Sequence, residues 1–458
     1  MRRIIFIILC LFLLTITPVF AVNRPGEAPF NTWNFDQWNT RIPSPHGYIP
    51  SKAIAVEGRP QDLFIHNNEV YLLTSNNIFV YDTNGIRIRQ IELSLNDVTY
   101  ETQLLTGIFV NNDFMYITDF DAGEIIKADL NGDIIRIFGE PQSDFISPGT
   151  LFRPSKIVVD DFERIFVQVF GVFEGIYSLT SDGEFINFFG ANHVDMTLTG
   201  AIQQLWRRIL TLEQRRAMAA FVPIEYSNLF IDTNGFIFAT VTTGMSPNNP
   251  NMIRQLNPLG VNVLPPQTVH LANASFADIT VDSYGVMTVI DQQWGMIIQT
   301  DRNGRLMFGF GGLGNQLGLF SRPIAIIEVN GNLWVLDELK RNITIFEITE
   351  FGQNVHAAMR LHNEGRYLEG IDIWNQVIRY NANYLLAYQG LGLAYFQLED
   401  FSRARNYFRL AGDRTGYSEA FSELSLLFMR ENFGWFFLGA MAILTMFIIK
   451  NRKKGGAA

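Results

Sequence analysis

Short apolar segments separated by tight polar turns recur six times between about residues 48 and 352. Each copy reads as an apolar strand, a turn, a second strand, and a third strand running to a glycine turn. The closing glycines lie 47, 51, 77, 44 and 48 residues apart, at Gly85, Gly132, Gly183, Gly260, Gly304 and Gly352. A period of about 45 to 50 residues built from short strands is typical of propeller blades, which stack on one another to bury their apolar faces. We therefore predict a mainly β fold, a six-bladed β-propeller over residues 48–352.

Details of the copies support this prediction. Asn330-Gly331 lies between two apolar runs, which is a strong hairpin signal because both central residues of such a turn need positive φ. In three copies the second strand closes on Asp, at Asp119, Asp291 and Asp337. These units resemble NHL-repeat propellers, which place Pro before the inner strand and close the second strand on Val-Ala-Asp. The other three second strands end in Leu-Leu-Thr, Val-Gln-Val and Ala-Thr-Val, and the resemblance implies an architecture without implying a function.

The sixth copy lacks an outer strand, because the sequence turns helical soon after Phe346. Residues 52–56, Lys-Ala-Ile-Ala-Val, have strand character and directly precede the first blade. We predict that they supply this strand and join the first blade to the last, which removes an exposed edge.

The 77-residue spacing marks an insertion at about residues 195–222 after the third blade. Its apolar pattern predicts a helical hairpin, with Thr211-Leu212-Glu213-Gln214 as a capping box for the second helix. One interpretation is a lid or docking arm for an acidic partner; the other is a decoration on the propeller rim. The candidate partner-binding residues are Trp206, Arg207, Arg208, Arg215 and Arg216.

A helical pattern with a 34-residue period replaces the strands over residues 353–430. Ala358 aligns with Gly392 and Trp374 with Phe408, so small residues fall where two helices of a hairpin approach closely. The second unit resembles a tetratricopeptide (TPR) repeat, a family whose grooves commonly bind peptides or proteins. Two repeats are short for independent stability, so we expect the module to lean on the propeller or on a partner. It either binds a partner or is a stalk that sets the height of the propeller.

Both ends of the chain indicate membrane targeting. Residues 1–21 have the basic start, apolar run and small final residue of a secretory signal peptide, with an uncleaved anchor as the alternative. Residues 433–449 are uncharged and long enough to span a bilayer as a helix. The basic residues 450–458 should remain cytoplasmic. We predict a single-pass cell-membrane protein, bacterial in character, with its body outside.

Composition limits the partners. Without the six cations of the two terminal segments the chain has 29 basic and 45 acidic residues, a net charge of about −16. Such a surface repels nucleic acid and anionic lipid, so we expect no nucleic-acid binding. The single cysteine, Cys10, lies in the signal segment, so the mature chain should have no disulfide.

Candidate chemistry is sparse. No His-Glu-x-x-His, Gly-x-Ser-x-Gly or P-loop motif is present, so we predict no catalytic residue, no metal and no cofactor. Similar six-bladed propellers include calcium-dependent lactonases and arylesterases, which makes a channel-mouth hydrolase the competing hypothesis. Calcium needs six to eight oxygen ligands. Because Asp119, Asp291 and Asp337 recur in register, we expect them to make a structural hydrogen bond in each blade instead.

Three arginines form a candidate ligand site. Arg59, Arg153 and Arg322 each precede a Pro at the start of an inner strand, where blades present residues around one mouth of the channel. They could converge on an anionic ligand, or each could pair with an Asp of a neighbouring blade. Binding of cell-surface glycan is a further alternative, with Trp33, Trp38 and Trp294 as candidate aromatic platforms. The favoured hypothesis is an extracytoplasmic scaffold that binds protein partners of an envelope, secretion or transport complex.

Overall fold

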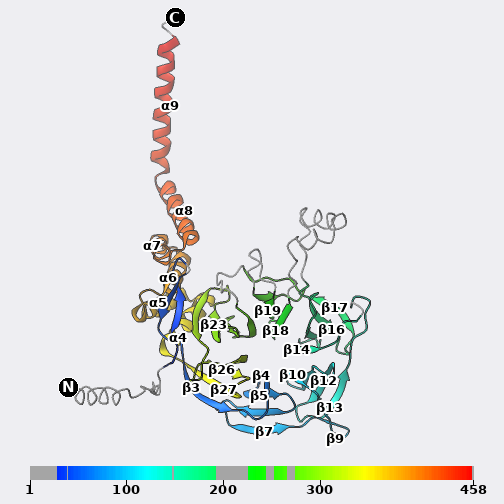
Figure 1. The fold of residues 1–458 in the computed structure, drawn as a ribbon. Coiled ribbons are helices and arrows are strands. Elements are labelled where there is room, and N and C mark those ends of the chain that lie inside the picture. Colours follow the sequence, from blue (N-terminus) through cyan, green and yellow to red (C-terminus); the bar gives the residue numbers. More distant parts are fainter. Residues whose placement is uncertain are drawn as a thin grey trace, which may run out of the picture.

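A computed structural model shows a six-bladed β-propeller followed by a helical module (Figure 1). The structure describes residues 28–38, 40–146, 149–191, 225–243, 252–265 and 274–455. The inner strands contact one another in a closed ring, in the order β4, β10, β14, β18, β21, β25 and back to β4. The predicted six-bladed propeller is therefore confirmed. The signal segment 1–21 and the insertion with its partner-binding candidates lie outside the described residues.

Four blades are built from consecutive antiparallel strands. In chain order these are β4 (Pro60–His66), β5 (Glu69–Thr74), β6 (Ile78–Asp82) and β7 (Arg87–Ile91); β10 (Leu105–Val110), β11 (Phe114–Asp119), β12 (Glu124–Asp129) and β13 (Ile134–Phe138); β14 (Pro154–Val159), β15 (Ile165–Val169), β16 (Ile176–Leu179) and β17 (Phe185–Phe189); and β21 (Phe276–Val281), β22 (Met287–Asp291), β23 (Met296–Thr300) and β24 (Leu306–Gly311). We number them blades I, II, III and V. A small ribbon, β8 (Ser94–Leu95) with β9 (Val98–Thr99), connects blades I and II.

Blade VI closes the ring with a strand from the other end of the chain. It contains β25 (Pro323–Val329), β26 (Asn332–Asp337) and β27 (Asn342–Ile348), and β3 (Tyr48–Ala55) pairs antiparallel with β27. The predicted outer strand is thus confirmed, although it begins earlier than expected. The Asn330-Gly331 turn has φ values of 52° and 82°, which confirms the predicted hairpin.

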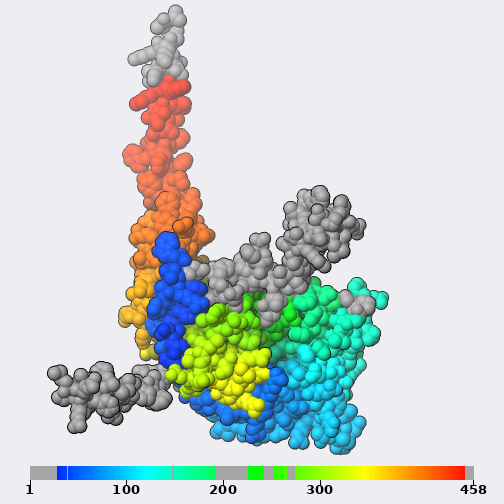
Figure 2. All heavy atoms as spheres, in the orientation of Figure 1, coloured from blue at the N-terminus to red at the C-terminus, as the bar shows by residue number. Residues whose placement is uncertain are grey.

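Blades IV and V depart from the four-stranded pattern. The described part of blade IV has three strands, β18 (Glu225–Ile231), β19 (Ile237–Thr243) and β20 (Ile253–Leu256). Blade V instead gains two strands, β1 (Thr32–Phe35) and β2 (Arg41–Ser44), outside β24. Gly309 permits this addition, because a Cβ there would lie only 2.2 Å from the Trp33 ring. Figure 2 shows this N-terminal segment in blue, beside the helical module in orange.

Six helices follow the propeller in the described chain. Their bounds are α4 (Glu350–Asn363), α5 (Tyr367–Tyr380), α6 (Leu385–Gln397), α7 (Phe401–Ala411), α8 (Arg414–Glu431) and α9 (Phe433–Gly455). The 34-residue period corresponds to the hairpins α4–α5 and α6–α7, which pack on each other. Gly392 lies where a Cβ would meet the Phe408 ring at 2.6 Å, so a small residue is needed at this helix contact.

The helical module shares one hydrophobic core with blades V and VI. Phe308 of β24 and Phe346 of β27 belong to the same buried cluster as Phe351 of α4 and Trp374 of α5. The Tyr384 hydroxyl also donates to the Met307 carbonyl of β24 at 3.0 Å. The expectation that the module leans on the propeller is confirmed.

Helix α9 extends away from the body (Figure 1). Within the described residues, no single helix is both long and apolar enough to cross a membrane. Helix α8 and residues 433–448 of α9 satisfy that requirement together, with a bend of 68° between them. The predicted membrane span, residues 433–449, lies within α9 and is helical. That it crosses a membrane stays a prediction.

Candidate ligand site in the propeller channel

One position, marked by a register shift, recurs in all six inner strands. The pairing of each inner strand with its neighbour shifts register near its start, which marks a β-bulge that redirects a side chain. The residues just after the shift are Asp62, Gly107, Lys156, Asn228, Asp278 and Ala325. The four polar members line a cavity of about 530 Å³ in the centre of the propeller. We call the six residues the channel ring.

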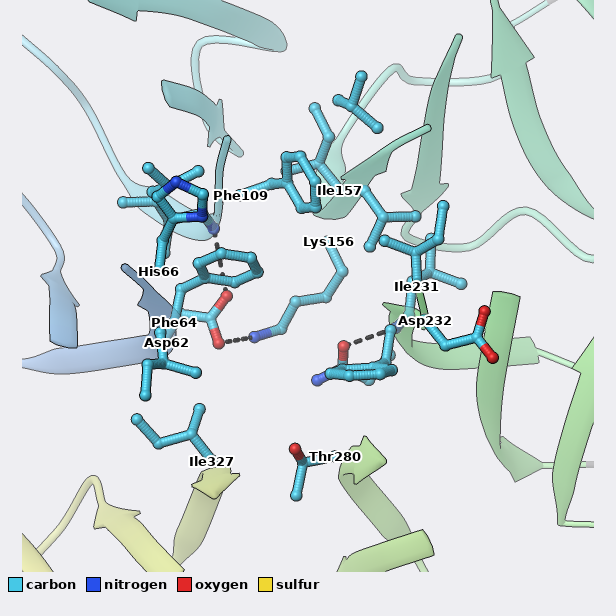
Figure 3. A pocket seen from close by; sticks show the side chains of 18 of the residues that line it. Asp62, Phe64, His66, Phe109, Lys156, Ile157, Ile231, Asp232, Thr280 and Ile327 are labelled. Carbon is cyan, nitrogen blue, oxygen red and sulfur yellow. Dashed lines mark hydrogen bonds and ion pairs between the residues drawn. The ribbon is translucent and has the colours of Figure 1, made fainter. Parts of the chain in front are cut away.

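Lys156 crosses the cavity to an acid two blades away. Its Nζ lies 2.6 Å from Asp62 Oδ1, and little of either side chain is exposed. Figure 3 shows the Lys156 side chain extended toward Asp62, with Phe64 and Phe109 nearby. Blade II, which lies between these blades, contributes Gly107 to the ring. A Cβ at Gly107 would lie 2.5 Å from the Ser155 carbonyl oxygen, so glycine permits the close approach of blades II and III.

The two ring carboxylates hold adjacent blades together. Asp62 accepts from the N–H of Leu63 in its own strand (3.0 Å) and from the N–H of Ile108 in blade II (3.2 Å). Asp278 repeats this arrangement with the N–H groups of Ile279 (2.7 Å) and of Ile326 in blade VI (2.6 Å). Two equivalent positions on blades I and V thus make the same bridge.

Asn228 adds a third hydrogen bond to Asp278. Its Nδ2 donates to Asp278 Oδ1 at 2.5 Å, and its Oδ1 accepts from the N–H of Leu229. The amide therefore joins blade IV to blade V. Asp278 receives three hydrogen bonds from neutral donors, whereas Asp62 has a cation beside it.

Burial perturbs both carboxyl groups. It raises the pKa of Asp62, an effect that Lys156 opposes. Burial raises the pKa of Asp278 to about 7; the positive charge of Lys156 opposes this rise and the negative charge of Asp62 adds to it. A buried carboxyl that titrates near neutrality inside a cavity is a candidate functional group.

The remaining cavity wall is largely apolar and reaches the surface at the inner hairpin turns. Phe64, Phe109 and Leu229 are among the apolar residues that line it. Asn112 and Asp161 also line it and are exposed, so the cavity opens at this end of the inner strands. An apolar pocket with a few convergent polar groups is the usual form of a small-ligand site.

The three predicted arginines lie at the start of the inner strands, away from this opening. Arg59 Nε and Arg322 NH1 both contact Glu338, at 2.7 Å and 3.1 Å. Arg153 lies elsewhere, with its guanidinium 5.5 Å from the centre of the Phe120 ring. The structure therefore brings Arg59 and Arg322 together at the carboxylate of Glu338 and places Arg153 apart from them. Their binding of an anion stays a prediction.

The expectation for the repeated aspartates is confirmed. Asp119 accepts from the N–H of Gln103 at 2.7 Å, Asp291 from that of Ser275 at 3.0 Å, and Asp337 from that of Ser321 at 2.6 Å. Each bond fixes the segment that leads into the inner strand of the same blade. These carboxylates therefore have a structural role in each of the three copies that contain them.

Two observations concern the residues of the hydrolase and glycan hypotheses. No group of three His, Cys, Asp or Glu side chains in the described ranges is arranged to hold a metal ion. Trp33 is buried in blade V and cannot act as a binding platform, whereas Trp38 and Trp294 are exposed.

Sequence reasoning missed the channel ring. The sequence contains one signal for the ring, namely the position two residues after the Pro of each Arg-Pro pair. This position is Asp62, Lys156 and Ala325 in the three copies that have the pair. Aligning all six copies at this position would have placed four polar residues around one axis. Their distances and shared cavity depend on the closed ring and were not accessible from any single copy.

Comparisons with known proteins identify no family for this chain. No protein-family model matches the chain, and no curated protein matches it. Among solved structures, a virginiamycin B lyase from Staphylococcus aureus is 13% identical over 65% of this chain and 88% of its own, with a TM-score of 0.39. A streptogramin B lyase is 13% identical over 72% of this chain and 96% of its own, with a TM-score of 0.40. A protein described as the extracellular domain of a one-component system from B. thetaiotaomicron is 12% identical over 69% of this chain and 38% of its own, with a TM-score of 0.38. Likenesses this distant carry no information on activity or ligand.

Proposed function

We propose that the protein is a membrane-anchored extracytoplasmic scaffold that binds protein partners through its NHL-like propeller and its TPR-like module. The observation that carries this proposal is the hydrophobic core that joins α4–α6 to blades V and VI. Because the two parts pack as one body, a partner bound to either part is held in a fixed orientation to the other.

The exposed apolar surface of α8 and α9 supports membrane attachment. Large apolar side chains are exposed on α8 and along α9, including Phe421, Phe428, Trp435, Phe437, Ile443 and Phe447. Exposed apolar surface of this extent marks a contact with protein or lipid. In our proposal α9 crosses the bilayer with residues 450–458 on the cytoplasmic side, and α8 lies along the outer surface.

Binding is favoured over hydrolysis because the polar groups of the channel ring already make inter-blade hydrogen bonds. A calcium site needs six to eight oxygen ligands, whereas Asp62 and Asp278 each accept backbone hydrogen bonds from two blades. The geometry thus offers a recognition pocket more readily than a metal centre.

Site-specific photo-crosslinking in intact membranes tests the scaffold. A crosslinking residue at Leu368 on α5 or at Phe162 beside the channel opening should give discrete protein adducts, because both positions are highly exposed. The matched control is Ile86, an equally exposed position on an outer turn of blade I, where we expect none. Adducts with lipid or glycan only would overturn the proposal.

A second measurement tests the anchor alone. Deleting residues 433–458 should release the chain from carbonate-washed membranes, while the complete chain stays bound. Release of the complete chain would refute the spanning role of α9 and leave the crosslinking result unaffected.

A further inference from the structure

The channel contains more buried negative than positive charge. Asp62 and Asp278 are each only 6% exposed, and Lys156 is the one Lys or Arg among the described residues that line the cavity. Lys156 pairs with Asp62. Among the described residues, Asp278 accepts hydrogen bonds from neutral donors only, and Lys156 acts on it through its charge without forming an ion pair with it. An ionised carboxylate without a paired cation is costly in such a site.

Lys156 shows how this channel accommodates an alkylammonium group. Its stem crosses the cavity and its charged end meets Asp62, the blade I member of the ring. Asp278 occupies the equivalent position in blade V and makes the same two backbone hydrogen bonds. The ring therefore contains two similar carboxylate sites, of which the chain's own lysine occupies one.

The cavity walls suit a cation on an apolar stem. Phe64 and Phe109 lie together in the wall, with ring centres 5.1 Å apart, and Phe230 also lines the cavity. A cation within about 6 Å of an aromatic ring is attracted by the negative face of the ring. Apolar neighbours such as Ile157 and Ile279 would contact the stem.

The opening adds attraction for cations. Asp161 and Asp232 line the cavity near its mouth, and the whole chain has a net charge of −10. A cleft lined by one sign of charge raises the local concentration of the opposite ion. This negative field would repel an anion, and the one ammonium group in the described cavity wall, that of Lys156, is already paired with Asp62.

We propose that the channel cavity binds an organic monocation, an ammonium or guanidinium group on an apolar stem, with its charge at Asp278. This chemistry has two sources: a free small amine, or a basic side chain of a protein partner. The second source rests on the proposed scaffold function and the first does not.

Calorimetry on the detergent-solubilised full-length chain tests the class of ligand. We expect n-butylammonium to bind at least tenfold more tightly than n-butanol, and butyrate to show no binding. Butanol or butyrate binding as tightly as butylammonium would overturn the proposal, as would absence of butylammonium binding.

Two substitutions with opposite expected effects locate the charge. Asp278→Asn should weaken butylammonium binding at least tenfold, whereas Lys156→Met should strengthen it severalfold because it removes the competing cation. The matched control is Asp97→Asn, an exposed carboxylate on the β8–β9 turn, which should leave the affinity unchanged. If Asp278→Asn fails to fold, Lys156→Met alone decides: unchanged or weaker binding would refute the proposal.

A peptide separates the two sources. Acetyl-Gly-Arg-Gly-amide is compared with n-butylguanidinium on the same protein. Equal or tighter binding of the peptide supports a partner side chain that enters through the opening. Binding of butylguanidinium alone supports a free small cation and would leave the scaffold proposal to its own crosslinking test.

Discussion

Two polar clusters in this molecule differ in how many of their hydrogen-bond donors and acceptors have a partner. At the junction with the helical module, Gln299 Nε2 donates to the hydroxyls of Tyr48 (3.2 Å) and Thr288 (3.0 Å), and its Oε1 accepts from His356 Nε2 (2.8 Å). In the channel ring, Lys156 has one close acceptor for three N–H groups among the described residues. The junction cluster is sealed in the core, whereas the channel ring borders a cavity.

The difference separates a structural role from a recognition role. A network of hydrogen-bonded side chains in a core fixes one arrangement of its elements, here α4 against blades V and VI. A cluster with unused donors next to a cavity has capacity for a further partner. Burial alone therefore does not distinguish the two clusters; pairing and access do.

The largest expected effect comes from removing the central amide of each cluster. Gln299→Leu leaves the hydroxyls of Tyr48 and Thr288 and the His356 N–H short of partners, and it should lower the free energy of unfolding by about 4 kcal/mol. Asn228→Leu removes one donor from Asp278, which keeps two backbone N–H groups, and it removes the acceptor of the Leu229 N–H, so it should cost about 2 kcal/mol. Urea denaturation followed by circular dichroism measures both. Equal losses would remove the distinction between the clusters.

The two clusters should also respond to pH with opposite signs. Burial lowers the pKa of His356 to about 4, from an ordinary value of 6.5. The unfolded chain then takes up a proton below pH 6.5 while the folded chain resists until about pH 4. The stability that depends on neutral His356 is complete above pH 6.5 and falls by about 3 kcal/mol as the pH drops to 4.

Asp278 gives the opposite slope. Burial raises its pKa from 3.8 to about 7, so its contribution is complete below pH 3.8 and is lost as the pH rises through 7. We expect denaturation at pH values from 4 to 9 to show two changes in the free energy of unfolding. In His356→Gln it should fall less steeply as the pH drops from 6.5 to 4, and in Asp278→Asn it should change less as the pH rises through 7. Comparison with the unmodified chain removes the contribution of the other titrating groups. A change of the same sign in both variants would contradict this assignment.

The repeat made much of the fold predictable, and long-range pairing made the rest inaccessible. Blade positions, the Asn330-Gly331 turn and the closing strand follow from local patterns that recur along the chain. The pairing of β1 with β24 joins Trp33 to Gly309, and no local pattern in either segment indicates it. The single clue was a glycine inside an otherwise bulky strand.

The candidate site shows the same limit. The Arg-Pro pairs were visible in the sequence, but the choice of Glu338 as the partner of both Arg59 and Arg322 depends on how blades I and VI meet. Asp62 and Lys156 lie 94 residues apart in the sequence. They meet because the blades form a closed ring, in which Gly107 permits the close approach of blades II and III. A property of the assembled ring cannot be read from one copy.

The smallest expected effect on stability concerns a third cluster, Glu338 with Arg59 and Arg322, at the end of the channel where the inner strands begin. This cluster is ionic and partly exposed, unlike the two buried clusters. Glu338 is nearly buried, but its partners Arg59 and Arg322 have side chains 58% and 49% exposed. Water screens such pairs, so Glu338→Gln should lower the free energy of unfolding by about 1 kcal/mol or less. It should also free both arginines, so that binding of a small dicarboxylate such as succinate, measured by calorimetry, becomes detectable if they form the predicted anion site. A loss as large as that of Gln299→Leu would show that this cluster belongs with the sealed junction, and no gain in succinate binding would count against the anion site.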